Sequence, residues 1–326
     1  MGPLPLCNAP AASASVDSPE PRSRIVISYA GLISMDDAIR KADVLIEALS
    51  YIRTFRDRLT VIKLGGSVME EADTLRATLQ DVVFMETVGM RPVLVHGGGK
   101  AIDQAMAAAG LRPRKLRGRR YTDEATLEIV VRVLKELSAA IEAQIRGLGG
   151  RAIGMIAGSL QCLFGEQLVL PDENGLPLDL GRVGRITRVD QALLSDLCAA
   201  GVVPVVPSLA VDEQGHALNI NADTAAAAVA ANLRAEKLVL LTDTPGILLN
   251  RSDEHSLLRS LDDTGCRELI ARGTIEEGMI PKVEACLESL KGGVRKTHII
   301  DGRIRHSLLL EIYTDRGVGT EIVLGP

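Results

Sequence analysis

Short apolar runs that alternate with helical patterns are the main structural signal of this sequence. Apolar runs of β type at Thr60–Leu64 and Pro92–His96 are each followed by glycines and then by a helical pattern. Similar runs recur at residues 202–206, 237–242 and 297–300. Strands that alternate with helices predict a parallel sheet with right-handed crossovers. We therefore expect an α/β fold with an open, mainly parallel sheet sandwiched by helices.

An additional amphipathic helix is predicted ahead of the first of these strands. From Ser34 to about Arg56, apolar residues recur at the helical period, and Ser34 can cap the first turn, which carries two aspartates. Residues 1–24 are rich in Pro, Ala and Ser and are expected to form a disordered tail. The segment Ile25–Leu32 fits either a short strand or this lead-in. The helix itself fits packing on its own domain or pairing with another subunit.

Three further segments have less regular patterns. The helix after Gly66 is expected to run through about Thr87. Residues Gln161–Ile186 alternate apolar runs with turn signals, which predicts β-hairpins in an antiparallel flap. The charged segment Asn250–Asp263 is predicted to be a loop.

Composition excludes several classes of protein. Aromatic residues make up 2% of the 326 residues and Trp is absent, so the core must be aliphatic and base-stacking nucleic-acid modules are disfavoured. The net charge is −5, and the basic run Arg112–Arg120 is more typical of a solvated or substrate-facing loop than of a DNA surface. We expect no nucleic-acid partner.

Cellular context is indicated by what the sequence lacks. No apolar run reaches the roughly 18 residues of a membrane span, and the N-terminus lacks a signal-peptide pattern. The five cysteines are scattered and form no CxxC motif, which suits a reducing compartment and disfavours structural zinc. We expect a cytoplasmic protein with no membrane partner and no protein-held metal.

Glycine-rich turns at strand ends are the first candidates for a functional site. Lys63-Leu-Gly-Gly fits either a phosphate site, in which Gly65 and Gly66 bring backbone N–H groups to an anion, or a buried strand that ends in a turn. A second strand ends in His96-Gly-Gly-Gly-Lys100, and two such turns strengthen the first interpretation. His96 alone is more typical of a packed histidine than of a catalyst.

Polar residues before two later helices add possible ligand contacts. One of Arg119 and Arg120 could clamp an acidic substrate with its planar guanidinium, or both could be surface residues. Asn219 and Asn221 alternate and could share one face toward a ligand, whereas Asp223 could orient cations. The same residues also fit ordinary turn and cap chemistry.

Taken together, the motifs resemble the N-acetyl-L-glutamate kinases of the amino acid kinase family. They occur in the family's order between Thr60 and Ile322. The matching segments are Lys63-Leu-Gly-Gly, His96-Gly-Gly-Gly, Gly118-Arg-Arg-Tyr-Thr122, Asn219-Ile-Asn-Ala-Asp223, Leu241-Thr-Asp-Thr-Pro-Gly246 and Gly278-Met-Ile-Pro-Lys282.

The resemblance implies a role for each matching residue. Lys63 and Lys282 would stabilise the transferring phosphoryl group, and Asp223 would hold both lysines. The acceptor would be bound by Gly98, Gly99, Arg120 and Asn219, with Arg120 gripping a carboxylate. The nucleotide would be bound by Gly65, Gly66, Thr242 and Asp243.

The implied reaction is phosphorylation of the γ-carboxylate of N-acetyl-L-glutamate by ATP with Mg²⁺, the second step of arginine biosynthesis. This nucleophile is already anionic, so no general base is needed. The anion must instead approach polyanionic ATP, and catalysis would rest on positioning and on cations. The implied lobes are residues 59–210 for the acceptor and dimerisation, and residues 211–326 for ATP and an arginine site.

The resemblance extends to regulation. The extension 25–58, with its helix, is similar to the extra helix of arginine-sensitive members, whose dimers interlace into hexamers. The segments His306–Glu311 and Gly317–Thr320 are similar to their arginine-binding segment. We therefore expect a homo-oligomer, a dimer or a hexamer, inhibited by L-arginine.

The sequence departs from the family pattern in two places, near Lys135–Ala143 and at Ile156–Ser159. Both lie outside the assigned residues, so they bear on kinetics and packing more than on the reaction. Two alternatives stay open at this point: a sibling kinase with another carboxylate acceptor, and a non-catalytic arginine sensor.

Overall fold

The computed structural model describes residues 2, 34–156, 160–172, 175–276, 278–313 and 317–325. Apart from Gly2, the expected tail and the segment Ile25–Leu32 lie outside these residues. The chain divides into two compact units, residues 1–45 and residues 46–326. Among the described residues, no helix is long and apolar enough to cross a membrane.

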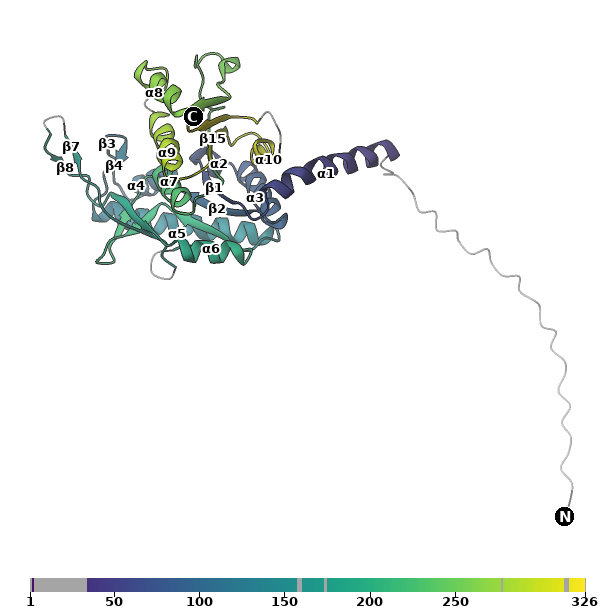
Figure 1. Ribbon diagram of the computed structural model, residues 1–326. Helices are drawn as coiled ribbons and strands as arrows, with labels where there is room; N and C mark the ends of the chain where they lie inside the picture. Colours follow the sequence, from purple (N-terminus) through teal and green to yellow (C-terminus); the bar gives the residue numbers. More distant parts are fainter. Residues whose placement is uncertain are drawn as a thin grey trace. The chain divides into compact units, whose positions relative to one another are not determined.

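The larger unit is organised by one eight-stranded sheet, as the alternating pattern predicts (Figure 1). Six strands are parallel, and β14 and β16 run the opposite way at one edge. In spatial order the strands are β14 (Ser260–Asp262), β16 (Thr320–Val323), β15 (Lys296–Asp301), β13 (Lys237–Thr242), β1 (Leu59–Leu64), β2 (Arg91–His96), β10 (Val203–Pro207) and β5 (Ala152–Gly154). The predicted first strand, β1, is therefore central.

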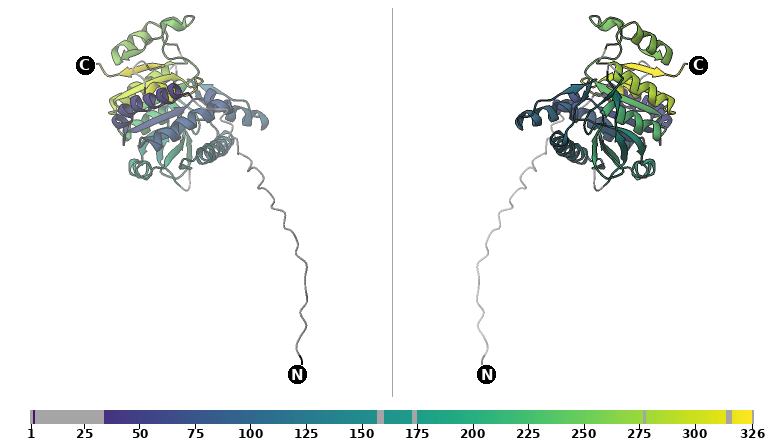
Figure 2. Two further views of the ribbon diagram at one scale, coloured as in Figure 1. Left: turned by 90° about the vertical axis from the view of Figure 1, so that its right-hand side faces the viewer. Right: turned by 90° about the vertical axis from the view of Figure 1, so that its left-hand side faces the viewer.

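Helices cover both faces of this sheet because its strands alternate their buried side chains between the faces. On β1, Val61 packs with helices α6, α7 and α9, whereas Ile62 packs with α3, α5 and α10. Figure 2 shows this layering from two opposite sides. The helix bounds are α3 (Ala72–Thr87), α5 (Glu124–Gly147), α6 (Gln191–Ala199), α7 (Ala222–Asn232), α9 (Ile280–Lys291) and α10 (Ser307–Ile312).

The predicted flap is part of a second, four-stranded sheet. Strands β6 (Leu163–Gln167) and β9 (Gly184–Val189) are antiparallel as expected, and β7 (Leu170–Pro171) pairs with β8 (Pro177–Leu178) as a hairpin. The flap prediction did not include two further strands of this sheet. The first pairs with β6 in parallel, and the second pairs with the first in antiparallel. The added strands are β11 (Leu209–Val211) and β12 (Ala217–Asn219).

Two local predictions are wrong. The helix expected from Gly66 to Thr87 breaks at Glu71, whose backbone is extended (φ −101°, ψ 116°), so α2 (Gly66–Glu70) and α3 are separate. The loop expected at residues 250–263 contains the 3-10 helix η1 (Glu254–Ser256) and strand β14, and α8 (Asp263–Ala271) begins at its end. The sheet continues through both expected lobes, and their division at residue 210 stays a prediction.

The N-terminal helix is confirmed as α1 (Met35–Phe55). The backbone N–H of Asp37 donates to Ser34 Oγ at 3.1 Å, which is the predicted cap. None of its residues is buried, and Leu45 and Ile46 are 69% and 70% exposed. Within the described residues, the apolar side of α1 is therefore exposed.

Candidate active site

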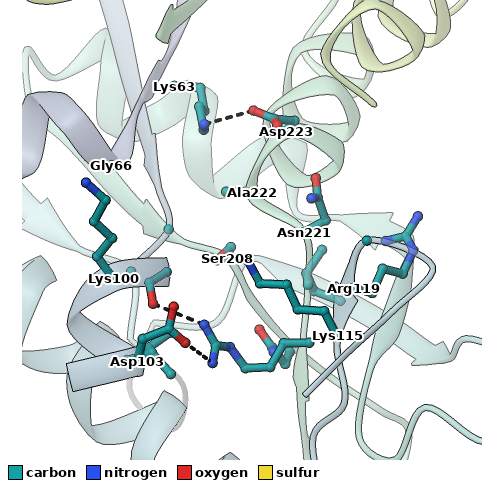
Figure 3. A pocket seen from close by; sticks show the side chains of 18 of the residues that line it. Lys63, Gly66, Lys100, Asp103, Lys115, Arg119, Ser208, Asn221, Ala222 and Asp223 are labelled. Atoms are coloured by element: carbon teal, nitrogen blue, oxygen red, sulfur yellow. Dashed lines mark hydrogen bonds and ion pairs between the residues drawn. The ribbon is translucent and has the colours of Figure 1, made fainter. Parts of the chain in front are cut away.

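A cavity of about 420 Å³ opens at the carboxyl ends of β1 and β2, the edge at which parallel sheets bind ligands. We call it cavity A (Figure 3). It is lined by the two glycine turns, the start of α7, the hairpin of β3 (Lys115–Leu116) and β4 (Arg119–Arg120), and Lys282 of α9. Of the expected acceptor contacts, it brings together Gly98, Gly99, Arg120 and Asn219.

A three-residue ion cluster lies at the end of cavity A toward α7. Lys63 Nζ lies 2.9 Å from Asp223 Oδ1, and Lys282 Nζ lies 3.4 Å from Asp223 Oδ2 (Figure 3 shows the first pair). Residues far apart in the sequence thus meet on one carboxylate. The expectation that Asp223 holds two lysines fits this geometry.

The position of Asp223 follows from the start of α7. Asn221 caps this helix, since its Oδ1 accepts from the backbone N–H of Thr224 at 3.0 Å, and Asp223 is therefore in the first turn. Burial raises the pKa of Asp223, but the Lys63 and Lys282 ammonium groups outweigh burial and hold that pKa below its ordinary value. The carboxylate is ionised at neutral pH.

The first glycine turn is required by close packing. A Cβ on Gly65 would clash with the carbonyl oxygen of Leu241 on β13. Only glycine therefore lets the turn after β1 pack this closely against β13. A Cβ on Gly66 would meet only Glu70 Oε1, at an ordinary contact distance of 3.7 Å, and Gly66 lines cavity A, whereas Gly65 does not. Direct contact between Gly65 and a phosphate stays a prediction.

Arg120 is held in place by the N-terminal half of α4 (Gly99–Ala108). Its Nη1 pairs with Asp103 and its Nη2 donates to the carbonyl oxygen of Gly99 at 3.0 Å. The side chain of Arg120 is 9% exposed. Asn219, at the end of β12, donates from Nδ2 to Thr122 Oγ1 at 3.0 Å. Both expected acceptor ligands are thus oriented by neighbouring groups.

A second cavity, cavity B, of about 270 Å³, follows β13. It is lined by Asp243 and the turn after it, by residues 274–276 and by Lys282. Lys282 therefore lines both cavities. Thr242 lines neither A nor B, because it is buried and its hydroxyl donates to the Thr244 carbonyl at 2.9 Å.

His96 is a packed residue, as its setting in the sequence favours. It is fully buried, its Nε2 lies 2.7 Å from Ser138 Oγ, and its Nδ1 lies 3.0 Å from the Gly97 carbonyl. Burial lowers its pKa to about 4, so the imidazole is neutral at pH 7. It does not line cavity A.

A third cavity, cavity C, of about 590 Å³, lies beside β15 and α10. Glu311 accepts from the backbone N–H groups of Val318 and Gly319 at 2.6 and 3.1 Å, and from His298 Nδ1 at 2.7 Å. In this tautomer the buried Nε2 of His298 is an acceptor without a hydrogen-bond partner among the described residues. Lys237 also lines this cavity.

Aromatic residues gather next to cavity C. Tyr313 makes edge-to-face contacts with Tyr51 of α1 and with Phe84 of α3, at centroid distances of 6.1 and 5.9 Å. Lys237 Nζ lies 4.7 Å above the ring centroid of Phe55. The end of α1 and helices α3 and α10 thus share one aromatic contact network, in a chain with only seven Phe and Tyr residues in total (three Phe and four Tyr).

Among the polar residues that line cavity A, sequence reasoning missed Asp103 and Ser208. Asp103 has the appearance of an ordinary acidic residue near the start of a helix. Ser208 follows β10, and its backbone N–H donates to the His96 carbonyl at 2.9 Å. Neither residue belongs to a motif, and only the folded chain places them in this cavity.

Comparison with known proteins agrees with this architecture. The model of the amino acid kinase family matches residues 58–301. Acetylglutamate kinase from Moorella thermoacetica is 45% identical over 291 residues, which covers 88% of this chain and 98% of that protein. Acetylglutamate kinase from Symbiobacterium thermophilum is 45% identical over 294 residues, with 88% and 98% covered.

Solved structures show the same fold. N-acetylglutamate synthase from Neisseria gonorrhoeae, complexed with coenzyme A and N-acetyl-glutamate, has a TM-score of 0.78 at 28% identity, covering 87% of this chain and 64% of that one. Carbamate kinase from Giardia lamblia bound to AMP-PNP has a TM-score of 0.56 at 17% identity, covering 82% and 99%. With the family model and these relatives, the chain belongs to the amino acid kinase family.

Proposed function

We propose that this protein transfers the γ-phosphoryl group of ATP to the γ-carboxylate of N-acetyl-L-glutamate and gives N-acetyl-L-glutamyl 5-phosphate and ADP, the second step of arginine biosynthesis. The observation that carries the proposal is the Lys63–Asp223–Lys282 cluster, because Lys282 lines both cavities. Cavity A would hold the acceptor and cavity B the nucleotide. Relatives named acetylglutamate kinase support the choice of acceptor.

The main barrier in this reaction is electrostatic. A carboxylate must approach a polyphosphate, and charge builds up on the transferring group between them. Lys63 and Lys282 are held where that charge develops, so they need little reorganisation during transfer. Loss of one such cation is expected to cost about 3–4 kcal/mol of transition-state stabilisation, by analogy with one oxyanion-hole donor.

The acceptor would be oriented by groups at the other end of cavity A. The turn at Gly98 and Gly99 presents backbone to the cavity, and α4 begins there with free N–H groups. Arg120 and Asn219 offer side-chain donors. This arrangement leaves the γ-carboxylate toward the lysines and needs no general base, which agrees with His96 being neutral and buried.

Mg²⁺ would reach the site with ATP as part of the substrate. Within the described residues, no group of three or more His, Cys, Asp or Glu side chains is placed to hold a metal ion. Asp243 and Glu276 line cavity B and are the carboxylates that a phosphate-bound ion would meet there. When bound, Mg²⁺ would neutralise phosphate charge.

The reaction is tested by ADP release and by hydroxylamine trapping of the acyl phosphate. The acceptors are N-acetylglutamate, glutamate, aspartate and none. We expect turnover only with N-acetylglutamate, and a fall of about 10²–10³-fold in kcat for Lys282→Met. Turnover with glutamate or aspartate alone favours a sibling kinase. No acyl phosphate with any acceptor, together with arginine binding, favours a non-catalytic sensor.

We also propose that cavity C binds L-arginine as an inhibitor. The carboxylates of Glu311 and Glu321 and the free Nε2 acceptor of His298 suit a guanidinium or ammonium group, and Lys237 suits a carboxylate. The Neisseria gonorrhoeae synthase was also solved with coenzyme A and L-arginine, at 26% identity and a TM-score of 0.74, covering 87% of this chain and 65% of that one.

Arginine inhibition is tested by titrating the activity with arginine up to millimolar concentration, with lysine as the control ligand. Glu311→Gln should weaken the inhibition, measured as the ratio of activities with and without arginine, because it removes the carboxylate charge. Wild-type activity that is unchanged at millimolar arginine would contradict the proposal.

The uncovered face of α1 supports assembly with further copies of the chain. Leu45, Ile46 and Leu49 are exposed and apolar. We propose that these residues pair with α1 of another subunit in a homo-oligomer larger than a dimer. Sedimentation of the wild type and of Leu45→Lys/Leu49→Lys tests this, because the charged variant should sediment as a smaller species. Equal masses would count against it.

A further inference from the structure

The β3–β4 hairpin carries two cations on the same face. Its turn residues Arg117 and Gly118 have φ of 50° and 73°, as in a type I′ turn. Lys115 is directly opposite Arg120 in the antiparallel register, and Leu116 is opposite Arg119. Lys115 and Arg120 therefore share one face of the hairpin, and both line cavity A, as does Arg119. Like charges directly opposite each other destabilise a strand pair, so this arrangement calls for an anion.

Most other charges around cavity A already have partners. Asp223 holds Lys63 and Lys282, Asp103 holds Arg120, and Glu70 lies 2.6 Å from Lys100. Lys115 and Arg119, by contrast, form no ion pair with any described residue, and of these two only Lys115 is on the same face of the hairpin as Arg120. Figure 3 shows the Lys115 side chain extending from the hairpin into the cavity.

The Asp103–Arg120 pair changes what Arg120 can contribute. The guanidinium can still donate directed N–H hydrogen bonds, but the carboxylate of Asp103 beside it cancels most of its net charge. A second carboxylate that approaches Arg120 also meets Asp103. An added positive charge on the same face offsets that repulsion, and Lys115 supplies it.

We propose that Lys115 receives the α-carboxylate of the acceptor and is a specificity-determining residue of this site. The inference rests on the proposed function, in which the γ-carboxylate is at the Lys63–Lys282 end of cavity A. The other carboxylate then lies toward the hairpin, where Arg120 directs it and Lys115 neutralises it. Acceptors without this second negative charge are selected against.

The test compares N-acetylglutamate with its α-amide, which keeps the γ-carboxylate and lacks the α charge. For Lys115→Met we expect KM for N-acetylglutamate to rise about tenfold, the low end for a charge-assisted hydrogen bond, with kcat within about twofold. KM for the α-amide should not change, so the discrimination between the two acceptors shrinks about tenfold. Lys115→Arg should restore most of the discrimination.

The matched control is Arg112→Met, which removes one positive charge from the same basic run but lies outside the lining of cavity A. It should leave the discrimination unchanged. Suppose that the wild type phosphorylates N-acetylglutamate but Lys115→Met changes KM equally for both acceptors, or changes neither KM. That result overturns the role of Lys115 and leaves the proposed function standing. A wild type that phosphorylates no N-acetylglutamate overturns the proposed function instead. In that case, titration calorimetry with N-acetylglutamate and its α-amide decides the role of Lys115.

Discussion

Replacing Asp223 by Asn removes the charge that organises the two lysines while keeping the shape of the side chain. At an effective dielectric constant near 20, the 2.9 Å and 3.4 Å contacts correspond to gross attractions of about 6 and 5 kcal/mol. Desolvation of the buried carboxylate offsets much of this. Breaking a buried ion pair by removing one partner typically costs about 3–5 kcal/mol, and we expect the free energy of unfolding to fall by that amount.

The same change should act on the transition state. With the carboxylate gone, Lys63 and Lys282 repel each other, so neither stays where charge builds up on the transferring phosphoryl group. We expect kcat to fall about 10²–10³-fold, comparable to the loss of one preorganised donor. MgATP should stabilise the variant more than the wild type in thermal unfolding, because its phosphates replace the missing anion.

The assays are ADP release at saturating substrates and urea unfolding with and without MgATP. Asp103→Asn is the matched control, since it also turns a carboxylate of cavity A into an amide but leaves the lysines paired. It should change KM for the acceptor more than kcat. A folded Asp223→Asn enzyme with kcat within about fivefold of the wild type would refute the reasoning.

Three further predictions concern the frame of the site. Gly65→Ala should lower the free energy of unfolding by about 1–3 kcal/mol in urea, because its Cβ would meet the Leu241 carbonyl, whereas Gly66→Ala should change it by less than about 0.5 kcal/mol. Burial lowers the pKa of His96 to about 4, so below about pH 6.5 the unfolded chain binds a proton that the folded chain does not. Stability should therefore fall as the pH drops, by about 2–3 kcal/mol from this residue between pH 7 and 4.5, and His96→Gln should show a smaller loss in urea titrations at the two pH values. Thr242→Val removes the hydroxyl that holds the turn beside cavity B, and it should raise KM for ATP without changing KM for the acceptor; an equal rise in both would contradict this account.

The central strand and the residues Lys63 and Asp223 were predictable because their signals are local, whereas Lys282 depended on the family resemblance. Lys63 comes just before a glycine turn, Asp223 is in the first turn of a helix, and family motifs bring Lys282 to the same site. The environment of Arg120 was not predictable, because it depends on Asp103, which only the packing of α4 against the hairpin brings close. Short elements such as β14 were missed because three residues carry too little periodicity to mark a strand.

The aromatic contacts beside cavity C give the molecule built-in optical probes. The chain has no Trp and four tyrosines, so its intrinsic fluorescence comes from few places. Tyr51 and Tyr313 touch each other beside this cavity, whereas Tyr121 follows the β3–β4 hairpin and lies beneath the guanidinium of Arg114. Burial raises the pKa of Tyr313 to about 12, which keeps this phenol protonated in ordinary buffers. In a Tyr29→Phe/Tyr121→Phe background, Tyr51 and Tyr313 are the remaining tyrosines, and their emission can report occupancy of cavity C without any label.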